Sequence, residues 1–148
     1  MVDTATAKPK AEPGSLASLM TPSKTVTVDY PRFTGMTVDL CYLAREELVK
    51  LRKRCMSTKW DKKSNQPLEE FDDDKFIVEY CKSVIKGWKG LKYKYLEELL
   101  LVDVSGLDPE DELPFTPANS ELLMKNATDF DTWVTETVGD LENFTGDK

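Results

Sequence analysis

The side chains that most often perform chemistry in proteins are unevenly represented in this chain of 148 residues. The chain has no histidine, which removes the usual general base, the Ser-His and Cys-His nucleophile pairs and the commonest zinc ligand. Carboxylates and lysines alone can support catalysis, but no phosphate-binding glycine loop accompanies them. We therefore expect a protein that is not an enzyme, with no catalytic residue and no cofactor.

Three consecutive carboxylates, Asp72, Asp73 and Asp74, form the cluster that could bind a metal ion. Their neighbours lack the ligand spacing of a calcium-binding loop. Aspartate is also a preferred residue at the N-cap and in the first turn of a helix. We interpret the triplet as a helix start and expect no metal site.

The three cysteines, Cys41, Cys55 and Cys81, are odd in number and lie far apart, without a CxxC pair. With no histidine to complete a ligand set, metal binding by these residues is not expected. Reduced and partly buried thiols are the default for such cysteines. We expect them to be unlinked and dispensable for chemistry.

Two groups of basic residues raise nucleic-acid binding as a hypothesis. The first group is Lys50, Arg52, Lys53 and Arg54, and the second is Lys59, Lys62 and Lys63 around Trp60. The net charge of −7 opposes binding to a polyanion,. We interpret the first group as a solvated helix face. The second lies in an exposed loop or short hairpin that turns at residues 61–65, where Trp60 covers the core or contacts a protein partner. No nucleic-acid partner is expected.

Hydrophobic periodicity divides the chain into an arm and one domain. Residues 1–25 contain no aromatic side chain and are rich in Ala, Thr, Ser, Lys and Pro, a composition that predicts a flexible N-terminal arm. In the domain, residues 26–146, a period of two over 26–30 and 36–42 predicts a small N-terminal β-hairpin. The longer period from residue 43 onward predicts helices. We expect a mainly α fold, α+β at most, of four to five helices.

The broad apolar stripe that follows the aspartates predicts a central helix ending at Gly87. Glycine enters the left-handed conformation at low cost and therefore commonly ends helices. Trp88 would then fold back over the last turn, and Gly90 would let the chain reverse. We interpret Gly87, Trp88 and Gly90 as a structural corner of the core, with Trp88 largely buried.

Further helices are predicted in the C-terminal third. The Thr-Pro pair at residues 116–117 is typical of an N-cap followed by the first helical position. A last helix is expected to begin with Thr128 or Asp129 as its cap. It carries an apolar stripe that includes Phe130 and Trp133.

Charge is distributed unevenly along the chain. Residues 45–96 hold 14 Lys and Arg against 9 Asp and Glu, whereas residues 97–148 hold 2 against 14. Such polarity favours head-to-tail self-association or a charged protein partner, although neutralisation within the chain is the simpler explanation. We expect weak, salt-sensitive oligomers in which basic residues around Trp60 face acidic residues of a neighbour. The residues assigned to this protein-interaction surface are Lys59, Trp60, Lys62, Lys63, Asp108, Glu110, Asp111, Glu112, Phe130 and Trp133.

Three segments, taken in order, resemble the phage tail assembly chaperones. They are "DLCYLAREELVKLRKR" at residues 39–54, "FIVEYCKSVIKGWKGLK" at 76–92 and "DELPFTPANSELLMKNATDFDTWVTETVGDLENF" at 111–144. The signature is the order of parts: Leu-Tyr-Leu before a charged helix, a helix closing on Gly-Trp-x-Gly-Leu, an acidic Pro-Phe-Thr-Pro start, and a final helix running into Asn-Phe. The resemblance covers roughly residues 33–146.

This resemblance implies a non-enzymatic viral protein made beside the tape measure gene of a long-tailed phage. Members of the family coat the tape measure protein, recruit tail tube subunits and are shed from the mature tail. The implied partners are therefore the tape measure protein, the tail tube protein and further copies of the chain. Many members also occur as a longer frameshifted product, which would extend from "ENFTGDK" at the end of this sequence.

Two alternatives remain open: a stable structural virion protein, such as a tail tube or tail completion component, and an enzyme that depends on carboxylates or lysine. Apolar runs such as residues 99–102 are too short to span a bilayer,, so no membrane partner is expected. The first residues lack a signal-peptide pattern. We expect the protein in the host cell cytoplasm and absent from the mature virion.

Overall fold

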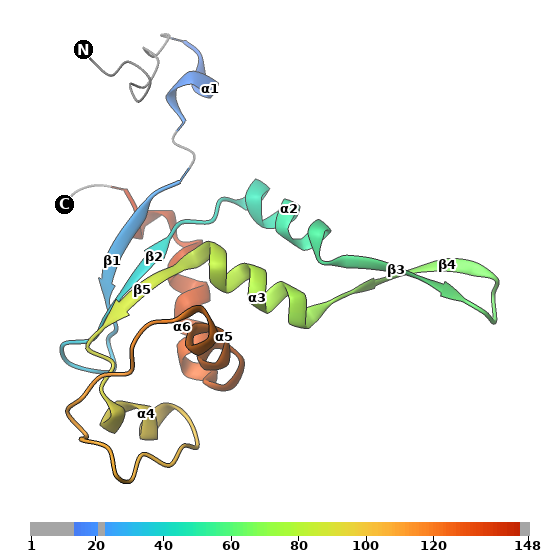
Figure 1. The fold of residues 1–148 in the computed structure, drawn as a ribbon. Helices are drawn as coiled ribbons and strands as arrows, with labels where there is room; N and C mark the ends of the chain where they lie inside the picture. The colour runs from blue at the N-terminus through green and yellow to red at the C-terminus, as the bar shows by residue number, and fades with distance from the viewer. Residues whose placement is uncertain (1–13, 21–22, 146–148) are drawn as a thin grey trace, which may run out of the picture.

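The fold of a computed structural model, which describes residues 14–20 and 23–145, is α+β. Its described residues form six α-helices and five strands in two antiparallel sheets, and strands account for 22% of these residues. The prediction of a mainly α domain with a single small hairpin is therefore wrong. The third strand of the first sheet was missed, and the segment expected as an exposed loop or short hairpin forms the second, two-stranded sheet (Figure 1). Most of the expected N-terminal arm, residues 1–13 and 21–22, lies outside the described residues.

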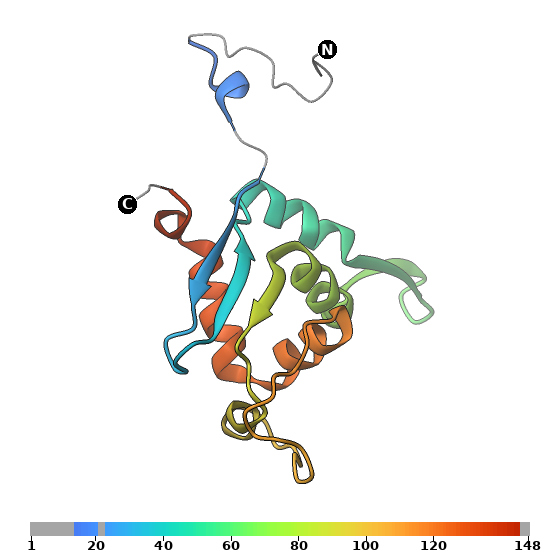
Figure 2. The same cartoon turned by 60° about the vertical axis from the view of Figure 1, so that its left-hand side comes forward.

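A three-stranded antiparallel sheet forms one layer of the body. Its order is β1 (Thr25–Asp29), β2 (Thr37–Cys41) and β5 (Ile85–Lys89). The pairing of β1 with β2, centred on Thr27 opposite Asp39, confirms the hairpin predicted from the alternating pattern. β2 occupies the centre of the sheet, and Figure 2 shows helices packed across one face.

The corner predicted at Gly87 is a strand instead. Helix α3 (Asp73–Val84) stops three residues before Gly87, and the chain passes directly into β5. Ile85 already has extended backbone angles, φ −104° and ψ 115°. It pairs with Leu40, and Trp88 pairs with Val38. Pairing with β2 satisfies backbone groups of residues 85–89 and buries β-branched and aromatic side chains, which strands accommodate well.

The two glycines of this segment have different roles from those predicted. Gly87 does not adopt the left-handed conformation; a β-carbon there would lie 3.0 Å from Oδ2 of Asp39, the residue opposite it in the sheet. The left-handed residue is Gly90, with φ of 78°. A β-carbon at Gly90 would lie 2.1 Å from the carbonyl oxygen of Gly35. The chain thus turns at Gly90, where the backbone of the β1–β2 loop leaves no room for a side chain.

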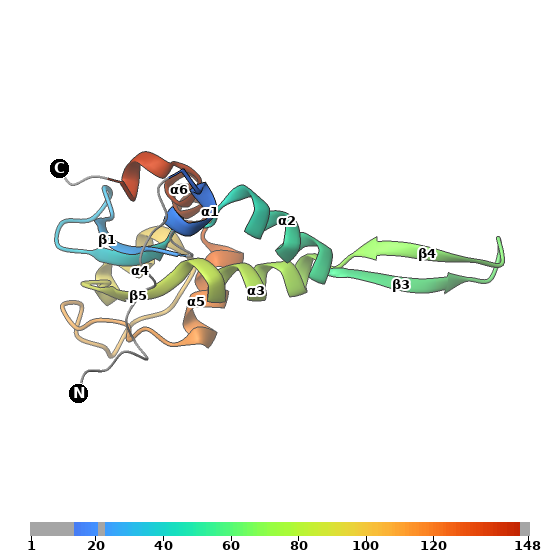
Figure 3. The ribbon, with the colours of Figure 1, turned by 90° about the horizontal axis from the view of Figure 1, so that it is seen from above.

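A second hairpin projects from the body. Helix α2 (Arg45–Arg54) leads into β3 (Met56–Asp61), and β4 (Gln66–Phe71) returns the chain to α3. At its base, the amide of Asp72 donates to the carbonyl of Cys55 at 2.8 Å. Figures 1 and 3 show this hairpin, which we call the arm hairpin, pointing away from the body at the far end of α2 and α3. The hairpin alternative considered for this segment is confirmed.

The remaining helices are short. They are α1 (Leu16–Leu19), α4 (Tyr93–Leu99), α5 (Pro117–Asn126), α6 (Thr128–Gly139) and the 3₁₀ turn η2 (Leu141–Asn143). The hydroxyl of Thr116 accepts from the amide of Asn119 at 3.0 Å, so the predicted Thr-Pro start of α5 is confirmed. The predicted cap of α6 is wrong, because Ala127 holds that position without a side-chain hydrogen bond. The tight connection from α5 leaves no residue between the two helices except Ala127.

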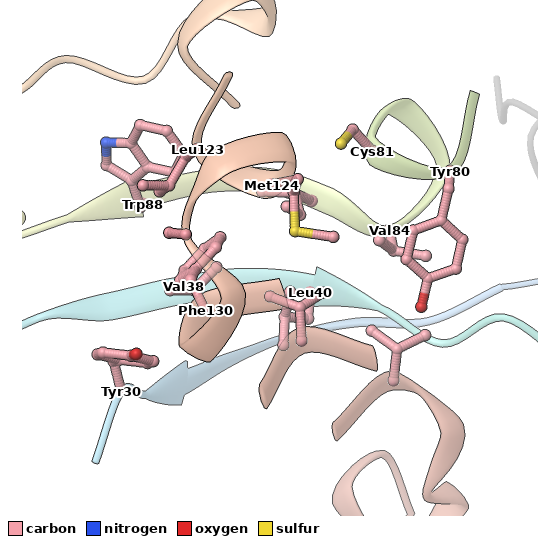
Figure 4. Packing of buried hydrophobic residues seen from close by; sticks show 14 of the residues in the cluster. Tyr30, Val38, Leu40, Tyr80, Cys81, Val84, Trp88, Leu123, Met124 and Phe130 are labelled. Carbon is pink, nitrogen blue, oxygen red and sulfur yellow. The ribbon is translucent and has the colours of Figure 1, made fainter. Parts of the chain in front are cut away.

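The core lies between the sheet and helices α3, α5 and α6. Val38, Leu40 and Trp88 project from the sheet toward these helices (Figure 4), and Phe130 of α6 is fully buried among them. Trp88 is 6% exposed, so its predicted burial is confirmed. Its indole N–H donates to the carbonyl of Leu113 at 2.9 Å, so the polar atom of this buried side chain has a hydrogen-bond partner,.

The close approach at Gly90 predicts an asymmetry between two left-handed glycines. Gly106 has φ of 88°, but no atom lies within 4 Å of the point that a β-carbon would occupy. Gly106→Ala should therefore lower the free energy of unfolding only through the left-handed backbone conformation, by about 1–2 kcal/mol. Gly90→Ala adds a clash with the backbone of Gly35 and should cost about 1–3 kcal/mol more,. Urea unfolding of both variants measures the difference. Equal losses of stability would show that the Gly90 turn is not tightly enclosed.

Candidate functional site

An open apolar cleft of about 420 Å³ lies beside the core. Three helices form its walls, α2, α3 and α6, and α5 supplies one residue to its floor. Its lining residues are Leu43, Leu48, Arg52, Phe76, Ile77, Tyr80, Met124, Asp131, Thr135, Val138 and Gly139. The volume falls within the range of protein sites that bind a ligand or a partner's side chains.

Helical spacing explains how each wall presents its residues. On α2 the lining residues are Leu48 and Arg52, four apart. On α6 they include Asp131 and Thr135, also four apart, so both walls show one column of a helix face,. The side of α3 that carries Cys81 and Val84 faces the core. The adjacent side, with Phe76, Ile77 and Tyr80, faces the cleft.

Three polar groups stand around the apolar lining. The guanidinium of Arg52 lies over the ring of Phe76, 5.1 Å from its centroid. The carboxylate of Asp131 accepts from the hydroxyl of Thr135 at 3.4 Å. Burial raises the pKa of the Tyr80 phenol; a hydrogen bond with Thr135 opposes this shift and the charge of Asp131 adds to it,. The phenol is therefore neutral at neutral pH and can donate a hydrogen bond. One cation, one anion and one phenol around apolar walls can orient a bound segment.

The predicted triplet of aspartates caps a helix. The carboxylate of Asp72 accepts from the amide of Lys75 at 3.0 Å, and Asp73 and Asp74 occupy the first turn of α3. Within residues 14–20 and 23–145, no group of three or more His, Cys, Asp or Glu side chains could hold a metal ion. The three cysteines are free and buried, as predicted. Burial also raises the pKa of Cys81 to about 12, which keeps its thiol protonated,.

The arm hairpin exposes an aromatic side chain at its outer end. Trp60 is 60% exposed and pairs across the hairpin with Pro67. Lys59 makes an ion pair with Glu70 on the opposite strand, at 3.0 Å. Lys62 lies in the turn beside Trp60, and Lys63 donates its backbone N–H to Asp61; neither has a side-chain ion pair among the residues described. A two-stranded hairpin with both edges open presents an unusually accessible surface.

The predicted acidic stretch is partly engaged within the chain. The carboxylate of Glu110 bridges the ammonium groups of Lys92 and Lys94, at 2.8 and 2.7 Å. The carboxylate of Glu112 accepts from the amide of Gly90 at 2.8 Å. Asp108 and Asp111, on the same exposed loop, have no ion pair among the described residues. The structure therefore favours neutralisation within the chain for Glu110, whereas Glu112 is held by a hydrogen bond from a neutral amide.

The assignment of the last helix to an exposed interface edge is wrong for Phe130. This residue is 0% exposed, and its ring packs against Tyr30 and Trp88. Trp133 is half-buried and contacts Tyr30 edge-on, with ring centroids 4.9 Å apart. Trp133 thus covers the core, and only part of it is open to a partner.

The structure does not gather the predicted interaction residues into one surface. The arm hairpin and the loop that carries Asp108 and Asp111 extend from opposite ends of the body (Figures 1 and 3). A contact between them would need two copies of the chain. The cleft was missed from the sequence, although the excess width of the α3 stripe, caused by Phe76 and Tyr80, is the signal that could have indicated a second apolar face.

Comparison with known proteins identifies no relative: no family model, no curated protein and no solved structure matches the chain. In the part of the chain that the structure describes, none of the helices has the length and hydropathy needed to cross a membrane.

The Glu110 bridge predicts an unusual titration. Hydrogen bonds from Lys92 and Lys94 lower the pKa of this carboxyl from 4.5 to about 2. Because the folded pKa is depressed, the contribution of the bridge to stability is present above about pH 4.5 and is lost as pH falls toward 2,. Carboxyl NMR titration should find the low midpoint, and Lys92→Gln with Lys94→Gln should return it toward 4.5. A midpoint near 4.5 in the unmodified protein would contradict the bridge.

Proposed function

We propose that this protein is a non-enzymatic tail assembly chaperone that binds the tape measure protein of a long-tailed phage and helps to recruit tail tube subunits. The sequence resemblance over residues 33–146 supports the family. The observation in the structure that carries the binding role is the open apolar cleft between α2, α3 and α6. An apolar cleft that stays open to solvent is typical of a surface that takes a partner.

The cleft suits the apolar face of an amphipathic helix. Two of its three walls, α2 and α6, present rows of side chains four residues apart, between which side chains spaced three and four residues apart can pack,. Arg52 and Asp131 line the cleft with opposite charges, so a bound helix gains from an acidic residue near Arg52 and a basic residue near Asp131,. A tape measure protein, as a long helical chain, offers such faces repeatedly.

A blocking substitution in the cleft tests this role. Thr135 and Thr132 are both exposed on α6, but only Thr135 lines the cleft. Thr135→Arg should fill the cleft and weaken binding to helical fragments of a tape measure protein by about tenfold or more, a loss of about 1.4 kcal/mol. Thr132→Arg, with the same charge change, should bind like the unmodified chain. Isothermal titration calorimetry gives both affinities.

Equal binding by the two arginine variants would exclude the cleft as the partner site. The chaperone proposal is tested separately, because it requires measurable binding of tape measure fragments by the unmodified chain. The alternative function, a structural virion component, predicts the chain in purified phage particles, whereas a chaperone acts in the host cytoplasm and is shed. Mass spectrometry of particles distinguishes these two functions.

We also propose that copies of the chain associate weakly through the arm hairpin. Lys62 and Lys63 at its turn, beside the exposed Trp60, would face Asp108 and Asp111 of a neighbouring copy. Glu110 and Glu112 contribute less, because each is already bound within its own chain. Such a contact joins two different surfaces and can therefore repeat along a filament.

Sedimentation at low and high salt tests this contact. Because exposed charges are screened beyond about 8–10 Å at physiological salt, raising the salt concentration should shift the protein toward monomer. Lys62→Glu with Lys63→Glu should have the same effect at low salt. Lys53→Glu with Lys89→Glu is a control of equal charge, on exposed lysines away from the turn of the hairpin. A strict monomer under all conditions, with tape measure fragment present, would defeat the proposal.

A further inference from the structure

A short apolar helix stands away from the body near the N-terminus. Helix α1 is a single turn, and Leu16, Leu19 and Met20 are 73, 56 and 61% exposed. These residues are spaced by three and one, so they lie on the same side of the turn. Figures 1 and 2 show α1 separated from the sheet and the other helices. A helix of one turn gains too little from its own hydrogen bonds to persist without an apolar surface to pack on.

The chain after α1 joins the body beside one end of the cleft. The carbonyl of Lys24 accepts from the amide of Tyr42 at 3.0 Å, and the next residue, Leu43, lines the cleft. The ring of Tyr42 packs on Phe144, with centroids 5.3 Å apart, just beyond the C-terminal end of α6. The same end of α6 supplies Val138 and Gly139 to the cleft.

The connection is long enough for α1 to reach the cleft. Met20 and Lys24 are four residues apart, and four extended residues span up to about 14 Å. The apolar triplet of α1 matches the spacing that the helix columns of the cleft accept. The cleft therefore offers open apolar lining within reach of α1.

We infer that α1 docks in the cleft of its own chain, with Leu16, Leu19 and Met20 against the end formed by Leu43 and Val138. A tethered segment faces its site at an effective concentration in the millimolar range, so the same chain's helix is favoured over that of a second copy. The contact is weak and α1 covers the cleft reversibly, because three side chains bury little apolar area. Where the proposed function holds, the covering helix competes with the partner helix for one cleft.

Disulfide trapping tests the contact in the protein alone. Leu19→Cys with Thr135→Cys places one thiol on α1 and one on the cleft wall, while the three native cysteines are buried. Mild oxidation should yield a cross-linked monomer, identified by peptide mapping. Leu19→Cys with Thr132→Cys is the control and should cross-link about tenfold more slowly, since Thr132 does not line the cleft,. Equal rates, or covalent dimers in place of monomers, would overturn the inference.

A second measurement separates this inference from the proposed function. Leu16→Asp with Leu19→Asp should remove α1 from the cleft. Because the covered state lowers the apparent affinity for a tape measure fragment, this double variant should bind the fragment more tightly by the same factor. Ala17→Asp with Ser18→Asp, of equal charge on the same turn, should not. Trapping without fragment binding defeats only the chaperone proposal. Fragment binding that Thr135→Arg abolishes, without trapping, defeats only the covering helix.

Discussion

The fold depends on the pairing of β5 with β2. This pairing begins at the residue that follows α3, so it fixes the direction of α3 relative to the sheet. It also carries Trp88 under the loop that follows α4, where the indole donates to Leu113. One side of α3 therefore packs in the core, and the adjacent side, which includes Phe76 and Ile77, lines the cleft. The cleft exists because a helix with too wide an apolar face is held with only part of that face covered.

The sequence was informative where the pattern was local. Alternation over two strands predicted β1 and β2 correctly, since their side chains obey a strict period of two,. β5 was missed because its register shifts opposite Asp39 and Leu40, which buries both Gly87 and Trp88 and breaks the alternation. Ile85 also continues the apolar stripe of the preceding helix, so the local pattern extends that helix to Gly87. Only a partner strand far away in the sequence decides between the two structures, and such non-local terms are not visible in a local pattern,.

The candidate site shows the same division. Free buried cysteines, the aspartate cap of α3 and the burial of Trp88 follow from residue type and helical spacing, and all three are confirmed. The cleft could not be derived, because its lining comes from three helices whose relative positions the sheet determines. Phe130 was misassigned for a related reason: a helix stripe indicates which residues are apolar, but not which edge of the stripe a neighbouring element covers. Its burial depends on Tyr30 and Trp88, from distant parts of the chain.

The cleft imposes one constraint on whatever it binds. Its apolar walls are helix faces, against which side chains spaced three and four residues apart can pack,. This spacing alone does not distinguish the tethered α1 from the helix of another protein. The two differ in other respects. The tethered α1 has high local concentration but a single turn, whereas a long partner helix has low concentration but many turns and charges that can meet Arg52 and Asp131,. A weak internal cover therefore excludes small apolar segments, while a long helix with matched charges displaces it. Selectivity for an elongated partner can arise from this competition without a more specific pocket.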